Sequence, residues 1–157
     1  MIKVGDKIPN SILRIKLDKI NEVSSHDLFA NQKVVLFGLP GAFTPTCSAK
    51  HLPGYISLLG EILNKGVDKV SCFSVNDPHV MKAWSEHNKI FNKIEMVADS
   101  DCSFTKKIGL AHDYGPAMGI RCLRFAMVLS NCVVEHFFVE KVGVFEVSSA
   151  QNILKYL

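Results

Sequence analysis

The residues best placed to do chemistry lie in the stretch Pro40-Gly41-Ala42-Phe43-Thr44-Pro45-Thr46-Cys47. Here an apolar run ends, the backbone turns, and a segment with helical periodicity begins. Thr44 can serve as N-cap, and Pro45 is tolerated at the first helical position, where its missing N–H costs nothing. Cys47 then falls in the first turn, whose free N–H groups and helix dipole favour a thiolate over a thiol. Cys47 is therefore a candidate nucleophile.

Ionisation alone can raise the reactivity of a cysteine only to a limited extent. From an ordinary thiol pKa of about 8.5, complete ionisation raises the thiolate fraction at neutral pH only roughly thirtyfold, which is about 2 kcal/mol. A larger rate enhancement must come from groups that stabilise the transition state.

Two elements must position Cys47. Residues 33–39 form an apolar run without polar alternation, which predicts a strand buried on both faces. Apolar residues then recur at helical spacing, which predicts a helix from Pro45 to about Asn64. Pro53 lies inside this helix and cannot donate to the carbonyl of Ala49, so we expect a kink or a loosened turn there.

The rest of the chain predicts an α/β fold with a central mixed sheet, organised as one domain over 1–157. An edge hairpin within 1–23 and a helical turn at 24–29 precede the central strand, and 110–121, with its glycines and proline, is expected to be a loop. The other expected elements are strands at 69–75 and 94–98, helices at 78–91 and 103–109, an antiparallel hairpin at 123–129 and 133–139, and a final helix that starts at a capping box at 148–151.

Composition excludes several classes of function. The 18 basic and 15 acidic residues give a net charge of +3 without a basic block, so we expect no nucleic-acid partner. No stretch reaches the length of a membrane span, and no signal-peptide core follows Met1, so we expect no membrane association. We predict a cytoplasmic protein, with an organelle as the alternative if a transit peptide has been removed.

The five cysteines are an odd number without a C-x-x-C pair, which argues against a disulfide scaffold. His51 follows Cys47 at i+4, but no second pair completes a zinc site, and we expect neither metal nor cofactor. His51 is interpreted as a packing or hydrogen-bonding residue rather than a general base. We expect Cys72 in the core, Cys102 unreactive because Asp99 and Asp101 raise its pKa, and Cys122 and Cys132 as incidental loop or turn thiols.

Four motifs, in this order along the chain, resemble those of the peroxiredoxins, specifically the type II or peroxiredoxin V subfamily: P-G-A-F-T-P-T-C-S at 40–48, H-L-P-G at 51–54, S-V-N-D at 74–77 and R-F at 124–125. The resemblance covers nearly the whole chain. It implies a thioredoxin-like fold and a thiol peroxidase that reduces hydrogen peroxide and organic hydroperoxides.

The resemblance also implies four site residues, namely Pro40, Thr44, Cys47 and Arg124. In this interpretation the Cys47 thiolate attacks a peroxide oxygen and becomes a sulfenic acid. Arg124, the Thr44 hydroxyl and loop N–H groups stabilise the thiolate and the departing oxygen, and Pro40 shields the sulfur. Arg121 is a weaker candidate for a supporting charge. Without the resemblance, a lone arginine on a strand would be interpreted as a surface residue.

The sequence departs from the animal members of this subfamily at Val147, where those members carry a resolving cysteine. We therefore hypothesise a one-cysteine cycle in which glutathione and glutaredoxin reduce the Cys47 sulfenic acid. One alternative is a two-cysteine cycle with a disulfide to Cys72 and thioredoxin as reductant. A second is a non-enzymatic thiol redox sensor. The resemblance also implies a homodimer and a part in antioxidant defence and cell redox homeostasis.

Overall fold

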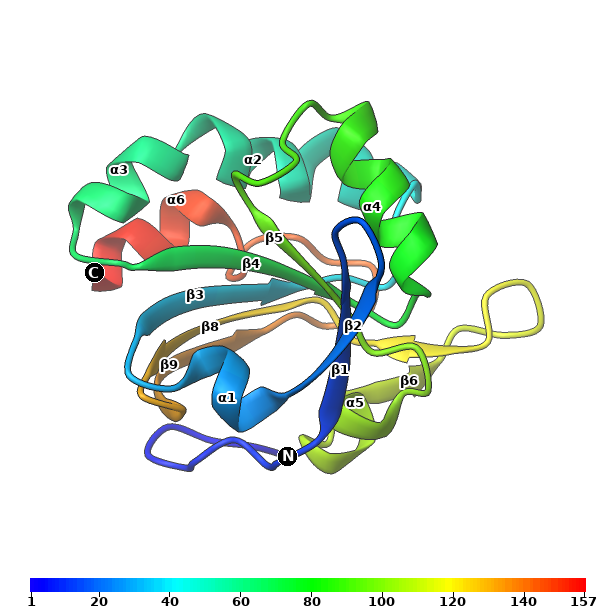
Figure 1. Ribbon diagram of the computed structural model, residues 1–157, viewed down its shortest axis with the longest axis horizontal. Coiled ribbons are helices and arrows are strands. Elements are labelled where there is room, and N and C mark those ends of the chain that lie inside the picture. Colours follow the sequence, from blue (N-terminus) through cyan, green and yellow to red (C-terminus); the bar gives the residue numbers. More distant parts are fainter.

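The apolar runs of the sequence form one seven-stranded mixed sheet in the computed structural model, which describes residues 1–157. Its strands are β1 (Ile12–Lys16), β2 (Ile20–Ser24), β3 (Lys33–Gly38), β4 (Lys69–Ser74), β5 (Glu95–Ala98), β8 (Phe125–Ser130) and β9 (Val133–Val139). The strand order is β2-β1-β5-β4-β3-β8-β9, in which β3, β4 and β5 are parallel and the outer strands antiparallel (Figure 1). The predicted central mixed sheet and N-terminal hairpin are confirmed.

Helices cover both faces of this sheet (Figure 1). They are α1 (Ser25–Phe29), α2 (Leu52–Ser57), α3 (Leu59–Asn64), α4 (Pro78–His87), α5 (Ser103–Lys107) and α6 (Ala150–Ile153), with a π-helical turn η1 (Cys47–His51) and a 3-10 turn η2 (Leu154–Tyr156). One core cluster lies under α2, α3, α4 and α6, and the second lies under α1 and α5. Successive residues of β3 alternate between the two clusters, which explains why this strand has no polar face. No helix is long and apolar enough to cross a membrane.

The start of α4 and the end of α3 lie where local sequence signals predicted them. The Asp77 carboxylate accepts from the N–H of Val80 at 2.9 Å and caps α4, which begins at Pro78. After α3 the chain leaves the helix through Gly66, whose φ of +85° belongs to the left-handed region.

Two expectations about the second half of the chain are wrong. The segment 110–121 is not a loop throughout, because β6 (Ala111–Asp113) and β7 (Ile120–Cys122) pair as an antiparallel hairpin, and only its tip is irregular. The cap of the last helix is Ser149, which accepts from the N–H of Asn152, and not Ser148. Ser148 instead donates its hydroxyl to the carboxylate of Glu140, which lies eight residues earlier and outside the capping pattern.

Gly38, the last residue of β3, generates the first testable prediction. It lies opposite Phe125 of β8, and a Cβ at Gly38 would overlap the ring of Phe125, which is fully buried. Gly38→Ala should therefore lower the free energy of unfolding by about 1–3 kcal/mol, measured by urea denaturation. Gly60→Ala in α3 is the matched control, because a Cβ there meets nothing within 4 Å. The control should be neutral or stabilising by up to about 1 kcal/mol, and equal losses in both variants would contradict the prediction.

Candidate active site

Cys47 lies beyond the carboxyl end of β3, in the first turn of the helical segment that begins at Pro45. The turn that carries it, η1, is π-helical, and the N–H of Leu52 bonds to the carbonyl of Cys47. Pro53 follows directly and offers no N–H to the carbonyl four residues back, so the predicted loosening of the helix occurs as this wide turn. A further break at Leu58 separates α2 from α3. The Cys47 side chain is only 1% exposed.

Arg124 provides the positive charge beside this sulfur. Its Nη2 lies 3.3 Å from the Cys47 Sγ, and the residue is 9% exposed. The contact follows from the sheet, because β8 begins at Phe125 and pairs with β3 at Gly38, so that Arg124 lies next to the end of the strand that leads to Cys47. Residues 77 positions apart are thus brought together.

The imidazole of His51 holds the other half of the guanidinium. Its Nδ1 lies 2.9 Å from Arg124 Nη1, and its Nε2 lies 3.1 Å from the carbonyl oxygen of Ser148. A guanidinium can only donate and a carbonyl can only accept, so Nδ1 is the acceptor and Nε2 carries the proton. Burial, and then the charge of Arg124, lower the pKa of His51 to about 3. His51 is therefore neutral at physiological pH and orients Arg124, in keeping with its interpretation as a hydrogen-bonding residue.

Thr44 and Pro40 line a cavity beside Arg124. The Thr44 hydroxyl donates to the carbonyl of Gly41 at 2.7 Å, so its side chain does not cap the helix as the sequence suggested. Both residues line a cavity of about 220 Å³ together with Pro45, Thr46, Tyr114, Met118, Arg124, Lys141, Val142, Gly143 and Val144. Because the cavity has apolar and cationic walls, it can admit a small polar molecule with an apolar substituent.

Arg121, the weaker candidate, is not brought to the sulfur. Its Nε donates to the carbonyl of Met118 and its Nη1 to the carbonyl of Val75. The guanidinium therefore binds the backbone near the β6–β7 hairpin. The sequence reasoning missed the segment 140–148, which supplies a wall of the cavity and the acceptor for His51. It also missed Phe145, whose ring lies 5.8 Å from the Arg124 Cζ. No local pattern in 140–148 could have revealed these contacts.

The other four cysteines are buried free thiols. Burial raises the pKa of Cys72, Cys102, Cys122 and Cys132. For Cys102 the expected direction is confirmed, but burial is the largest cause and the charge of Asp99 comes second. The interpretation of Cys122 as a loop or turn thiol is wrong, because it ends β7 and belongs to the core cluster under α1 and α5. Cys132 lies in the β8–β9 turn as expected, but it is buried in the same cluster.

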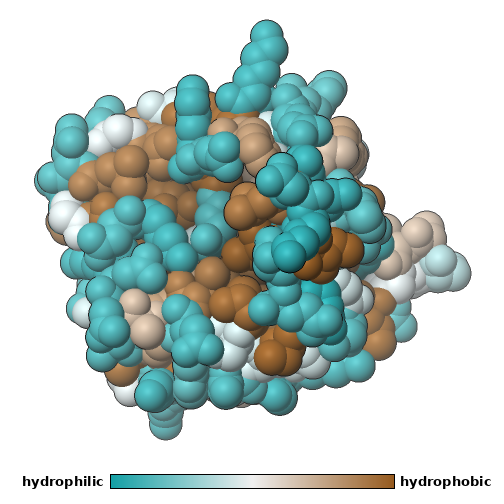
Figure 2. Space-filling view, in the orientation of Figure 1, coloured by the Kyte–Doolittle hydropathy of each residue, from teal (hydrophilic) through white to brown (hydrophobic).

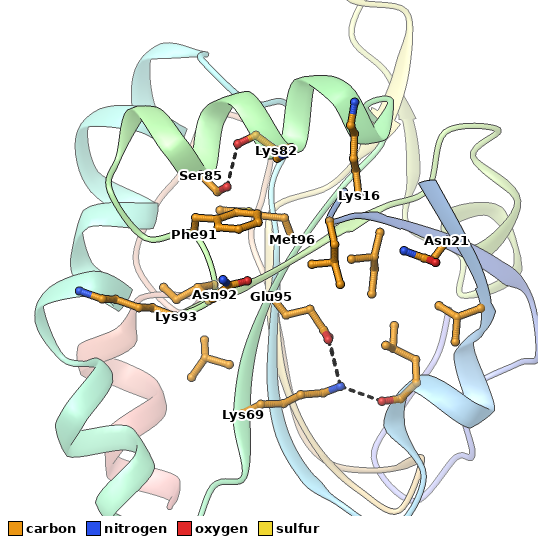
Figure 3. A pocket seen from close by; sticks show the side chains of 16 residues that line it. Lys16, Asn21, Lys69, Lys82, Ser85, Phe91, Asn92, Lys93, Glu95 and Met96 are labelled. Atoms are coloured by element: carbon orange, nitrogen blue, oxygen red, sulfur yellow. Dashed lines mark hydrogen bonds and ion pairs between the residues drawn. The ribbon is translucent and has the colours of Figure 1, made fainter. Parts of the chain in front are cut away.

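A larger cavity, about 440 Å³, lies elsewhere, between the β1–β2 hairpin, β5 and the end of α4 (Figure 3). Figure 2 shows hydrophobic side chains exposed among hydrophilic ones on this face. No cysteine lines this cavity, and its one glutamate, Glu95, pairs with Lys69 at 3.1 Å. Its lining therefore offers no thiol nucleophile, whereas Cys47 lies beside Arg124, which lines the smaller cavity.

The buried, neutral His51 predicts a pH dependence of stability. In the unfolded chain this imidazole takes up a proton near pH 6.5, whereas in the folded chain it does so only near pH 3. Between these values the unfolded state binds more protons, so acidification destabilises the fold through this group. From about pH 6 to about pH 4 the wild type should lose about 1.4 kcal/mol per pH unit more than His51→Gln. The measurement is urea denaturation at each pH, and parallel profiles would refute the assignment.

Comparison with known proteins agrees with this geometry. Residues 3–154 match the Redoxin family. Peroxiredoxin-2D of Arabidopsis thaliana is 45% identical over 159 residues, which cover 99% of this chain and 98% of the relative. The crystal structure of reduced Prx3 in complex with H2O2 from Vibrio vulnificus superposes with a TM-score of 0.96 at 46% identity, covering 99% of each chain. The Plasmodium falciparum antioxidant protein, described as a 1-Cys peroxiredoxin, has a TM-score of 0.93 at 31% identity, covering 99% of this chain and 98% of its own.

These matches extend over nearly the whole chain and confirm the thioredoxin-like fold that the sequence motifs implied. The chain also places a buried cysteine beside a buried arginine at the end of a central strand. It belongs to the Redoxin family and is a peroxiredoxin, a thiol peroxidase.

Proposed function

We propose that this peroxiredoxin reduces hydrogen peroxide and organic hydroperoxides through a sulfenic acid on Cys47, in a one-cysteine cycle with glutathione and glutaredoxin as the reductant. The proposal depends above all on the 3.3 Å contact between Arg124 Nη2 and Cys47 Sγ. A permanent cation at that distance favours the thiolate and lies beside the position where a leaving oxygen would develop charge.

The Cys47 thiolate attacks the terminal oxygen of the hydroperoxide. An S–O bond forms while the O–O bond breaks, and the proton of the terminal oxygen stays with it in the sulfenic acid. The other oxygen leaves as an alkoxide, or as hydroxide from hydrogen peroxide, and takes up a proton from water. The sulfur is thereby oxidised by two electrons and the peroxide is reduced by two.

Three side chains serve this step. Each terminal nitrogen of Arg124 has a second N–H beyond its contacts with Cys47 and His51, and these donors can stabilise the leaving oxygen. The proton of Thr44 is engaged by the carbonyl of Gly41, so the lone pairs of its oxygen remain to accept the peroxide O–H. This role differs from the donor role expected from the sequence. Pro40, a buried residue of the cavity wall, shields the thiolate from water.

The shape of the cavity supports alkyl hydroperoxides as substrates beside hydrogen peroxide. Its walls include the apolar side chains of Met118, Val142 and Val144, while the charge lies at Arg124 and Lys141. An alkyl group can contact the apolar wall while the peroxide faces the cation.

A one-cysteine cycle is supported by the state of the other thiols. Burial raises the pKa of all four, which keeps them protonated and poorly nucleophilic, and none is exposed for attack on the Cys47 sulfenic acid. Val147, at the position of the resolving cysteine in animal members, is 38% exposed and carries no thiol. An external thiol must then resolve the intermediate, and glutathione with glutaredoxin fits this need. The Plasmodium relative is described as a 1-Cys enzyme.

The free thiols and the surface support two further parts of the proposal. All five cysteines are free, which suits a reducing compartment such as the cytoplasm and a function in redox homeostasis. Phe43, Ile120 and Val142 are about half exposed near the cavity, and they suit a homodimer formed over this surface.

Arg124→Ala should lower the second-order rate constant of Cys47 oxidation by much more than roughly thirtyfold, because ionisation alone accounts for no more than that. The only tryptophan, Trp84, lies 3.3 Å from the hydroxyl of Ser48, next to Cys47, so stopped-flow fluorescence can follow the reaction. Alkylation of Cys47 by iodoacetamide should fall by thirtyfold at most. Arg14→Ala, an arginine paired with Glu22 and Asp101 away from the site, should keep the wild-type rate. A loss of only a few fold in Arg124→Ala would remove the leaving-group role.

The one-cysteine cycle predicts the mass of the oxidised protein. After one equivalent of peroxide, intact-mass analysis should show one added oxygen that dimedone captures, and turnover should occur with the glutaredoxin system. The thioredoxin system is run in parallel, with Cys47→Ser as the blank. Loss of two hydrogens without an added thiol would instead indicate an intramolecular disulfide and support the two-cysteine alternative.

A further inference from the structure

A buried carboxylate that the peroxidase mechanism does not use lies just after β9. Glu140 is only 6% exposed and makes no ion pair. One oxygen, Oε1, accepts three hydrogen bonds: from the N–H of Glu146 at 2.7 Å, and from the N–H and the hydroxyl of Ser148, both at 2.9 Å. A buried charge must be satisfied, and here the donors that satisfy it all come from one short segment. Glu140 therefore fixes the position of 146–148.

The main chain of the same residue contacts the catalytic strand. The N–H of Glu140 donates to the carbonyl of Arg124 at 2.9 Å and extends the β8–β9 pairing by one residue. Glu140 thus holds the backbone of Arg124 and the segment 146–148 at once.

From Ser148 a chain of hydrogen bonds leads back to the reactive sulfur. The carbonyl of Ser148 accepts from His51 Nε2 at 3.1 Å and from the hydroxyl of Tyr55 at 2.9 Å. His51 Nδ1 accepts from Arg124, and Arg124 contacts Cys47. The bonds therefore close a ring that runs from the Arg124 backbone through Glu140, Ser148 and His51 to the Arg124 side chain.

This closed chain of hydrogen bonds favours the tautomer of His51 that carries its proton on Nε2. Because the N–H and hydroxyl of Ser148 are both held by Glu140, the Ser148 carbonyl is fixed toward the imidazole. With that carbonyl turned away, Nε2–H would lose its acceptor, and only the Arg124 N–H at Nδ1 would still favour this tautomer. The Nδ1–H tautomer would then become populated and would set an N–H against the N–H of Arg124. Two donors cannot bond, so the guanidinium would shift from the sulfur.

We propose that Glu140 is a positioning residue that, by holding Ser148, selects the Nε2–H tautomer of His51 and keeps Arg124 aimed at Cys47. The inference rests on the proposed function of Cys47 and Arg124. A shift of the guanidinium by about 1 Å is enough to slow the oxidation step up to roughly a hundredfold.

The test combines kinetics with a direct view of the imidazole. Glu140→Ala should slow Cys47 oxidation by peroxide roughly ten- to hundredfold. The ring-nitrogen signals of His51, in protein carrying nitrogen-15 histidine, should move from the Nε2–H pattern to a mixture of tautomers. In Glu140→Gln an amide oxygen can still accept, so this conservative variant should recover part of the rate and most of the wild-type pattern. If Glu140→Ala does not fold, Glu140→Asp replaces it, because the shorter side chain withdraws the carboxylate by one methylene. The same loss of rate and the same mixture of tautomers are then expected.

Glu95→Ala is the matched control, because Glu95 also accepts from a serine, Ser71, but lies beside Lys69, away from the site. It should lose stability while keeping the rate and the His51 signals of the wild type. An unchanged rate or an unchanged tautomer in Glu140→Ala overturns the proposal. Failure of the proposed function would look different, because Cys47→Ser would then consume peroxide as fast as the wild type.

Discussion

The contact between the guanidinium of Arg124 and the sulfur of Cys47 is the interaction on which the site depends. Both groups are nearly excluded from solvent, and desolvation of a lone charge at either position would be costly. Their attraction offsets part of this desolvation cost. His51 and the face of the Phe145 ring complete the surroundings of the cation. A buried pair of this kind contributes to reactivity more than to stability, because its attraction is set against the desolvation of both partners.

The sheet and one irregular turn place Arg124 and Cys47 next to each other. The pairing of β3 with β8 carries Arg124 to the edge where β3 ends, at which α/β sheets place their ligands. The π-helical turn η1 then places Cys47 and His51 on the same side, where the sulfur meets one terminal nitrogen of the guanidinium and the imidazole meets the other. Such wide turns are frequent at functional sites, and here the following proline accounts for the turn.

The five thiols of this chain illustrate how position controls cysteine chemistry. Four of them are buried where burial is the largest effect, opposing the charged form and raising the pKa. Cys47 is buried just as deeply, but the guanidinium of Arg124, which also lines the smaller cavity, lies 3.3 Å from its sulfur. Cys47 therefore differs from the other four cysteines in its direct contact with a guanidinium and not in its burial.

The sequence by itself determined the parts that depend on neighbouring residues. The apolar run before Pro40, the Asp77-Pro78 helix start and the hairpin from Leu123 to Val139 were all predictable, because strand and helix periods, caps and turns act within a few residues. The motif around Cys47 identified the family and named Arg124 by resemblance. Only the tertiary structure decided that the Thr44 hydroxyl points to Gly41, that Cys122 is in the core, and that Ser148 binds Glu140 instead of capping a helix. The Thr44 and Ser148 hydrogen bonds span only three and eight residues, but each side chain has a competing capping role, and the packed structure decides between the two. The place of Cys122 in the core depends on segments far apart in the chain, such as its contact with the carbonyl of Leu39, and no local pattern contains such contacts.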